Sequence, residues 1–345
     1  MTQALFSTPQ TRTIAVFGAY GHTGRFVVAE LCKRGWTPIL CGRDADKLQT
    51  LSTSYPGLHT RVAGIEDPRS LDRAFSGAAA VINCAGPFLD TAAAVLEAAL
   101  RARIHYFDVA AEQGAVADVF QRFSTRAREA GIVVIPAMGF YGALGDLLAT
   151  AAKADWTDVD EIQIAVALDS WLPTRGTRLT GQRNTAQRQV VANGRLEPLE
   201  NSTQQRTWNF PAPFATQSVV ALPFSEIITM SRHLQSPEIH AYMNLQPLED
   251  VRNPETPSPK PADDSGRSAQ VFLVDVVVRR GNQQRRAIAR GRDIYAITAP
   301  IVVEAAIRVV DGQEERSGAF APGEIFDARD FLVSLCPGHL QVEIS

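Results

Sequence analysis

The sequence has few cysteines, and their arrangement excludes one class of site. The four thiols are scattered, form no C-x-x-C pair and have no histidine-rich partner segment of the kind that would bind zinc with them. We therefore expect no metal site, and buried cysteines in a reducing compartment. The cysteines are Cys32, Cys41, Cys84 and Cys336.

Long apolar runs are also missing. A membrane-spanning helix needs about eighteen uninterrupted apolar residues. The nearest window, residues 131–145, is uncharged but contains Pro136 and several glycines. The N-terminal segment Met1 to Arg12 lacks the basic start and apolar run of a secretory signal. We expect a cytoplasmic protein without a transmembrane segment, and loose peripheral contact with a membrane stays open.

The chain carries little net charge. Its 34 basic and 37 acidic residues give a formal net charge of −3, which does not suggest the basic face that nucleic-acid binding requires. Hydrophobic residues make up 45% and charged residues 21%, as in ordinary globular proteins. Because single cores usually stop growing below 345 residues, we expect two domains and no nucleic-acid partner.

Up to about residue 154, short β-branched runs alternate with longer helical stretches. This alternation predicts a Rossmann-type, doubly wound parallel sheet with helices on both faces. The predicted strands are 13–17, 37–41, 60–62, 80–84, 105–109 and 132–136, and the predicted helices are 23–34, 45–52, 68–75, 91–101 and 116–130.

After residue 155 the pattern changes to extended runs, which predict a second α+β domain built on a mostly antiparallel sheet. The runs are 161–168, 188–191, 217–222 and 270–279. Four prolines in residues 251–268 favour a surface loop, and residues 299–309 favour a helix.

The first strand and the first helix are joined by a glycine-rich turn. Gly18 permits a tight turn, Gly21 lets the backbone approach a pyrophosphate, and Gly24 lets the helix pack closely on the strand. Phosphates would then lie at the positive end of the helix. The alternative is a glycine loop without a ligand. The residues assigned to the cofactor here are Gly18, Ala19, Tyr20, Gly21, His22, Thr23 and Gly24.

The second strand has no acidic residue at its tip to hold a ribose 2′-hydroxyl, which disfavours NAD(H). Arg43 follows that tip, where its guanidinium could stack on adenine or bind a 2′-phosphate. Lys47 could add charge, and Asp44 is either a ligand or a helix cap. We expect NADP(H) as the cofactor, with a solvated loop arginine as the alternative for Arg43.

Small residues follow the fourth strand, where they would let the middle of a dinucleotide lie across the end of the sheet. The residues assigned to the cofactor are Cys84, Ala85, Gly86 and Pro87, while Asn83 before them could equally be a turn former.

With these motifs the chain resembles the saccharopine dehydrogenase-like oxidoreductases, including the trans-acting enoyl reductase branch. The matching segments, which span about 140 residues, are Gly18-Ala-Tyr-Gly-His-Thr-Gly-Arg25, Cys41-Gly-Arg-Asp44, Val81-Ile-Asn-Cys-Ala-Gly-Pro87, His105-Tyr-Phe-Asp108 with Glu112, and Ile135-Pro-Ala-Met-Gly-Phe140 with Asp146. The resemblance implies an NADP-binding Rossmann domain (residues 1–154), a substrate domain (155–300) and a C-terminal segment (301–345) that returns towards the first domain.

The chain departs from the family at Tyr141, where relatives commonly carry aspartate. Tyr141 is our candidate catalytic residue, as a phenol donor to a developing anion, and the alternative is an aromatic side chain that fills the hinge between domains. Asp108 and Glu112 could position substrate or cap the following helix.

A cluster in the second domain could receive an anionic or acyl substrate, with arginines on a solvated turn as the alternative. The cluster comprises Trp171, Arg175, Thr177, Arg178 and Arg183. The leading hypothesis is an NADPH-dependent reductase of a conjugated C=C or C=N bond in a small or acyl-carrier-linked substrate. A saccharopine-type amino-acid dehydrogenase and a non-catalytic NADP(H) sensor are the alternatives, and a homodimer is possible.

Overall fold

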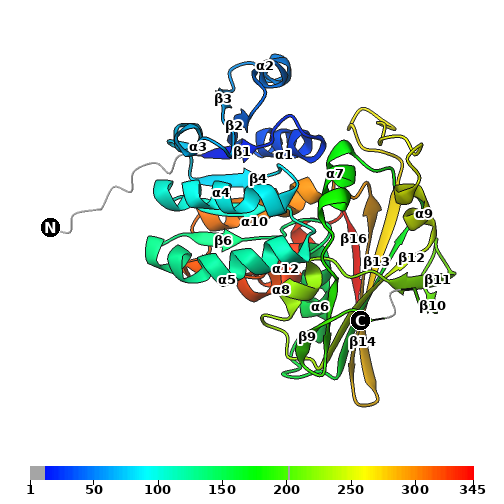
Figure 1. Cartoon of the computed structure of the whole chain (residues 1–345). Coiled ribbons are helices and arrows are strands. Elements are labelled where there is room, and N and C mark those ends of the chain that lie inside the picture. Colours follow the sequence, from blue (N-terminus) through cyan, green and yellow to red (C-terminus); the bar gives the residue numbers. More distant parts are fainter. Residues whose placement is uncertain (1–11, 201–202) are drawn as a thin grey trace.

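The computed structural model describes residues 12–200 and 203–345 as two β-sheets with helices packed around them (Figure 1). Nearly all of the N-terminal segment from which we expect no secretory signal lies outside these residues. The two sheets lie side by side, with helices on both faces of the first sheet and the long strands of the second reaching away from it.

The first sheet is parallel, and its seven strands follow the order β15-β6-β5-β4-β1-β2-β3. Six of them occupy the predicted positions, whereas β15 comes from the C-terminal part of the chain and pairs with β6. The strands are β1 (Thr13–Phe17), β2 (Thr37–Gly42), β3 (Thr60–Val62), β4 (Ala80–Asn83), β5 (His105–Asp108), β6 (Val133–Ile135) and β15 (Gly318–Ala319).

The side chains of alternate residues of β1 point to opposite faces of this sheet. Ile14 and Val16 belong to the core that also holds residues of α1 and α10, whereas Ala15 and Phe17 belong to the core with α3, α4 and α5. The helices around the sheet are α1 (His22–Lys33), α2 (Ala45–Thr53), α3 (Pro68–Phe75), α4 (Phe88–Ala102), α5 (Gln113–Ala130) and α10 (Thr298–Val310).

The second sheet follows the order β10-β11-β12-β7-β13-β14-β16, with β8 and β9 attached beside β12. Only β7 and β12 pair in parallel among its described strands. The predicted fold class, a parallel Rossmann-like sheet with a second, mostly antiparallel sheet, is thus confirmed. The strands are β7 (Glu161–Leu168), β8 (Gln189–Ala192), β9 (Arg195–Pro198), β10 (Gln205–Asn209), β11 (Thr216–Ala221), β12 (Glu238–Asn244), β13 (Val271–Arg280), β14 (Gln283–Arg292) and β16 (Gln341–Ile344).

Six further helices accompany the second sheet. The buried helix α6 packs against β13, β14 and α12. Residues 253–268 contain no helix or strand, as the prolines predicted, although α9 ends at Arg252. The helices are α6 (Ala143–Lys153), α7 (Arg175–Arg183), α8 (Glu226–Met230), α9 (Gln246–Arg252), α11 (Pro322–Ile325) and α12 (Ala328–Ser334).

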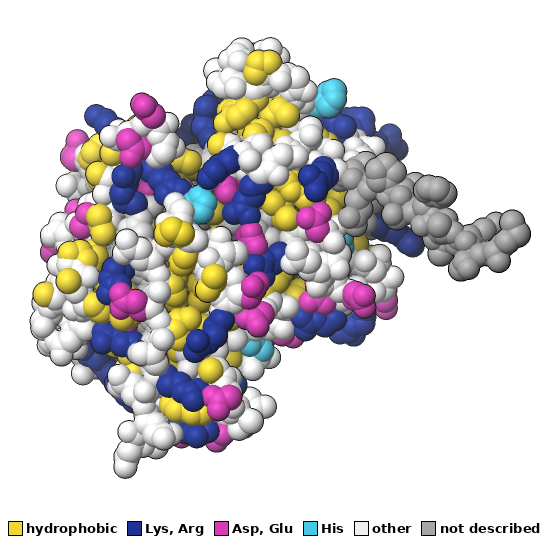
Figure 2. All heavy atoms as spheres, turned by 180° about the vertical axis from the view of Figure 1, so that it is seen from behind, with side chains coloured by type: hydrophobic (Ala, Val, Ile, Leu, Met, Phe, Trp, Pro, Cys, Tyr) yellow, Lys and Arg dark blue, Asp and Glu magenta, His cyan; other side chains and the backbone are white. Residues whose placement is uncertain are grey.

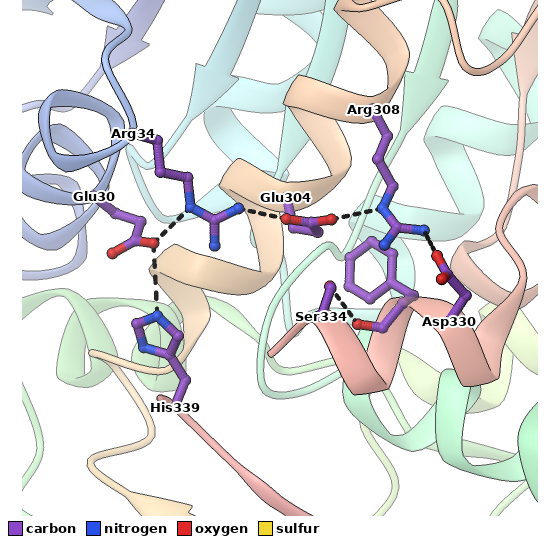
Figure 3. A network of polar contacts seen from close by, with 8 residues as sticks. Glu30, Arg34, Glu304, Arg308, Asp330, Ser334 and His339 are labelled. Atoms are coloured by element: carbon purple, nitrogen blue, oxygen red, sulfur yellow. Dashed lines mark hydrogen bonds and ion pairs between the residues drawn. The ribbon is translucent and has the colours of Figure 1, made fainter. Parts of the chain in front are cut away.

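A chain of ion pairs joins the C-terminal part to the helix after the glycine turn (Figure 3). Glu304 on α10 accepts from Arg34, the residue that follows α1, and, at 2.7 Å, from Arg308. Arg308 also pairs with Asp330 of α12 at 2.7 Å. Because these carboxylates and guanidinium groups are shared among three helices, α1 and α12 are held on α10 by one network.

The surface carries both signs of charge. On the face opposite to that of Figure 1, acidic and basic side chains are interspersed and neither sign gathers over a whole domain (Figure 2). Within residues 12–200 and 203–345, no helix combines the length and apolar character needed to cross a bilayer, and no cluster of histidine, cysteine and carboxylate groups could hold a metal ion.

Candidate functional site

The glycine turn has the geometry that a dinucleotide pyrophosphate needs. Gly18 has a φ of 84°, and a Cβ atom there would lie 2.9 Å from the amide nitrogen of Ala85. A Cβ atom on Gly24 would overlap the carbonyl oxygen of Gly18. Helix α1 begins after Gly21 without a side-chain cap, so its first amide groups are available to an anion. These residues fit a bound dinucleotide.

The loop after β2 lies beside this turn. Asp44 caps α2 by accepting from the Lys47 amide, and its carboxylate also pairs with Lys47 Nζ at 2.6 Å. The Lys47 ammonium lies 5.7 Å from the ring centre of Tyr20. Arg43 is exposed and has no ion-pair partner among the described residues. Asp44 therefore caps α2 and pairs with Lys47, whereas the guanidinium of Arg43 stays available to a ligand.

The loop after β4 lies beside the glycine turn, because β4 is the neighbour of β1 in the sheet. Asn83 is buried, and its side-chain oxygen accepts from Ala85 N at 3.0 Å, so it shapes the turn. Thr91 Oγ1 donates to Ala85 O at 2.6 Å. Of the predicted residues Cys84, Ala85, Gly86 and Pro87, the first two thereby approach Gly18 across adjacent strand ends. Burial raises the pKa of the Cys84 thiol, so this group is protonated near neutral pH.

Asp108 and Glu112 both accept hydrogen bonds from backbone amides, and Glu112 also lines the cavity described below. Asp108 accepts from the amides of Ala110 and Ala137 and from the Tyr106 hydroxyl. Glu112 accepts from Phe88 N at 2.8 Å and Ala111 N at 3.1 Å. The side chain of Glu112, the residue before α5, makes no capping hydrogen bond to that helix, which corrects the capping alternative for Glu112. Both carboxylates instead fix the loops at the ends of β4, β5 and β6.

A cavity of about 490 Å³ lies between these strand ends and the second sheet, and we call it the inner cavity. Its size is that of a small-molecule pocket. Thr23, Cys84 and Gly86 contribute to it from the predicted cofactor residues. On the other side it is lined by a group of aromatic rings that includes Phe140, Tyr141, Trp171, Phe224 and Tyr295.

Tyr141 stands within this aromatic lining. Its ring stacks on Phe224 with centroids 4.1 Å apart and lies 5.8 Å from Trp171. The hydroxyl is buried and has no hydrogen-bond partner among the described residues. Burial raises the pKa of this phenol well above its ordinary value, so the hydroxyl keeps its proton. Both sequence alternatives, a proton donor and a packed aromatic ring, are compatible with this position.

Arg188 also lines the inner cavity, and sequence reasoning did not select it. Its guanidinium lies 4.5 Å from the ring centre of Phe224, and Nη1 donates to Pro223 O at 2.5 Å. Both contacts come from a segment more than thirty residues later. A single arginine at the start of a strand carries no sequence signal for such a position.

The arginines that the sequence did select lie on a helix, α7, rather than on a turn, which corrects that alternative. Arg178 donates to the Thr256 carbonyl at 2.7 Å, Arg183 pairs with Asp90 at 3.3 Å, and Arg175 is exposed. Trp171 and Thr177 of this cluster line the cavity, whereas none of its three arginines does.

Tyr295 contacts α7 through its hydroxyl and the glycine turn through its ring. The hydroxyl lies 2.8 Å from Thr177 Oγ1 and accepts from Trp171 Nε1 at 3.1 Å. The Tyr295 ring also meets the His22 ring edge to face, with centroids 5.2 Å apart. His22 Nε2 is buried without a partner among the described residues, and burial lowers the pKa of this imidazole. His22 therefore packs as a neutral ring beside the turn.

Comparison with known families agrees with this geometry. Residues 14–135 match the family model described as the saccharopine dehydrogenase NADP binding domain. This match confirms the resemblance inferred from the motifs and NADP(H) as the cofactor class.

Relatives in sequence cover only part of the chain. A bovine saccharopine dehydrogenase-like oxidoreductase is 27% identical over 152 residues, which is 39% of this chain and 35% of that protein. A lipid droplet localized protein of Caenorhabditis elegans is 28% identical over 168 residues, 45% of this chain and 39% of that protein. The chain thus aligns with little more than a third of the length of these curated relatives.

Among solved structures, the chain is similar to saccharopine dehydrogenase (L-Glu forming) from Saccharomyces cerevisiae, with a TM-score of 0.69. The similarity covers 96% of this chain and 99% of that one, at 12% identity. At this identity the likeness shows the two-sheet fold alone.

Proposed function

Because residues 14–135 form a domain of the saccharopine dehydrogenase NADP-binding type, we propose that this protein is an NADP(H)-dependent oxidoreductase that reduces a conjugated C=C or C=N bond. The observation that carries the proposal is the inner cavity. It extends from the glycine turn to an aromatic lining in which Tyr141 holds an unpartnered hydroxyl. When bound, the nicotinamide supplies a hydride to one atom of that double bond.

The residues of the chain have three tasks in this proposal. The turn from Gly18 to Gly24 holds the pyrophosphate, and Arg43 meets the 2′-phosphate. The aromatic rings exclude water from the inner cavity and hold a flat conjugated group. Tyr141 Oη donates a proton to the atom that does not receive the hydride, so one hydride and one proton are added in total.

The alternatives fit the inner cavity less well. A saccharopine-type substrate carries several carboxylates, whereas this lining combines aromatic side chains with threonines and contains, among the described residues, one cation that is not on the surface, Arg188. A sensor without catalysis would not need a substrate-sized space beside its cofactor turn. We retain a cytoplasmic location and a homodimer as predictions of the sequence.

Two measurements test the proposed function. Titration with NADPH and NADH, followed by intrinsic fluorescence, should show tighter binding of NADPH. A panel of conjugated enals, enones, enoic acids and imines should then contain a compound that oxidises NADPH with saturable kinetics. A folded protein that binds NADPH but oxidises it with no compound of the panel would favour the sensor, and a protein that binds neither nucleotide would contradict the cofactor assignment.

A further inference from the structure

Another cavity adjoins the inner cavity, and a partly buried arginine lines both. A second cavity of about 620 Å³, the outer cavity, lies between β11 and α9. Four residues line both cavities: Arg188, Leu222, Leu248 and Arg252. Arg252 is exposed, whereas Arg188 is partly buried. A ligand that entered the inner cavity from this side would pass the Arg188 guanidinium.

Two nitrogen atoms of the Arg188 side chain, Nε and Nη2, donate no hydrogen bond to the described residues. Nη1 donates to Pro223 O at 2.5 Å. No carboxylate of residues 12–200 and 203–345 forms a salt bridge with this arginine. Burying a guanidinium without a paired anion costs free energy, and arginines in such positions are suited to bind a carboxylate through two parallel hydrogen bonds.

Two buried carboxylates approach this region, but neither forms a salt bridge with Arg188 among the described residues. Both oxygens of Glu112 already accept from backbone amides. Glu226 uses one oxygen to accept from Phe224 N at 2.8 Å; burial raises the pKa of its carboxyl group, whereas the positive charge of Arg188 lowers it. Glu249, which lines the outer cavity, is exposed to solvent. The Nε and Nη2 donors of Arg188 therefore remain available to a ligand at the junction.

We propose that Arg188 binds the carboxylate of an unsaturated monocarboxylic substrate and directs its apolar, conjugated body into the aromatic inner cavity. This inference rests on the proposed function and names its substrate class. One partly buried cation suits one negative charge, and rings such as Phe224 and Trp171 suit a flat apolar body rather than a polar chain.

The test uses the full chain loaded with NADP⁺, which prevents turnover, and two probes of the same shape. trans-Cinnamate carries the carboxylate, and trans-cinnamamide is its neutral counterpart. Binding is measured by calorimetry and by the fluorescence of tryptophan, since Trp171 lines the cavity. The wild-type protein should bind cinnamate about tenfold to a hundredfold more tightly than cinnamamide, because a charged hydrogen-bonded pair forms only with the acid.

Arg188→Gln should abolish this preference and leave the affinity for cinnamamide unchanged, whereas Arg188→Lys should keep part of it. Arg195→Gln is the matched control, because Arg195 is exposed on β9 and lines neither cavity. Thermal unfolding shows whether each variant folds. If Arg188→Gln does not fold, the Arg188→Lys protein takes its place in the comparison of the two probes.

Equal affinities of the wild type for both probes, no saturable binding of cinnamate, or an unchanged preference in folded Arg188→Gln would each overturn the inference. NADP⁺ binding is measured separately and the probes are also titrated without nucleotide. Loss of nucleotide binding alone would therefore count against the proposed function, while loss of the carboxylate preference alone would count against the role of Arg188.

Discussion

The ring of Tyr141 stacks on the ring of Phe224 at a centroid distance of 4.1 Å, and this contact fixes the direction of the phenol hydroxyl. Phe224 belongs to the segment before α8, whereas Tyr141 lies two residues before α6, so the stack joins two distant parts of the chain in the lining of the inner cavity. Because Glu226 accepts from the Phe224 amide, the position of the ring is also held through its backbone. A proton donor in this place would thus be positioned by packing rather than by hydrogen bonds.

We expect Tyr141→Phe to reduce the rate of substrate reduction by about a hundredfold or more, as loss of a general acid does. Binding of NADPH should stay unchanged. The free energy of unfolding should not fall, because the hydroxyl is buried without a partner among the described residues. Single-turnover oxidation of NADPH and urea unfolding check the two expectations. Tyr55→Phe, at a partly buried tyrosine outside the cavity, is the control, and an unchanged rate in Tyr141→Phe would leave the ring as a packing element.

Arg43→Ala should weaken binding of NADPH by about tenfold to a hundredfold and change binding of NADH little, because only NADPH offers a 2′-phosphate to the guanidinium. The structure makes Arg43 the residue to test, since the neighbouring Lys47 is already paired with Asp44. Fluorescence titration of both nucleotides gives the ratio of affinities. Arg69→Ala removes an exposed arginine from the start of α3 and should leave that ratio unchanged. Equal losses for both nucleotides would contradict phosphate recognition and point to stacking on adenine.

Gly24→Ala should destabilise the fold by about 1–3 kcal/mol and abolish nucleotide binding, because the new Cβ atom would overlap the Gly18 carbonyl and force the turn apart. Gly114→Ala is a matched control on another helix. Its Cβ atom would make only ordinary contact with Leu89, at 3.5 Å, and alanine favours helix. Urea unfolding and NADPH titration of both variants provide the test. A Gly24→Ala protein that binds NADPH normally would show that the turn can relax.

The sequence predicted those parts of the molecule whose signal is local. The first strand and helix follow from a short apolar run that ends in a glycine turn, and Thr13–Phe17 was predicted without error. Strand β15 was missed because its two residues, Gly318 and Ala319, carry no pattern, and only pairing with β6 makes them a strand. Strand β14 was missed because arginines interrupt its apolar alternation.

The residues of the candidate site also divide into those that the local sequence marks and those that only the folded chain brings together. The three loops that we predict to bind the cofactor are marked in the sequence by glycines and small residues after predicted strands, and the parallel order of the sheet brings these loops together. Arg188 was not found, because its position depends on Pro223 and Phe224, which approach it only in the folded chain. The arginines of α7 were selected because they lie close together in the sequence. Closeness in the sequence does not show which side chains point into a cavity.

A buried pair away from the cavity makes stability depend on pH. His233 Nε2 lies 2.8 Å from Asp146 Oδ1. Burial opposes protonation of His233, but the Asp146 carboxylate outweighs burial, and Glu324 adds to its effect while Lys153 opposes it, so the pKa of His233 lies above its usual value. A raised pKa in the folded state means that the pair stabilises the fold fully below the ordinary histidine pKa, and that this contribution is lost as pH rises through the folded value.

We therefore expect His233→Gln to lower the free energy of unfolding more at about pH 6 than at about pH 9, on either side of the ordinary histidine pKa. Urea unfolding of wild type and variant at both pH values gives the two differences. His59→Gln removes an exposed histidine and should show no such change between the two pH values. A His233→Gln difference that is constant with pH, or that grows towards pH 9, would mean that His233 stabilises the fold as a neutral hydrogen-bonding ring and that its charge contributes nothing.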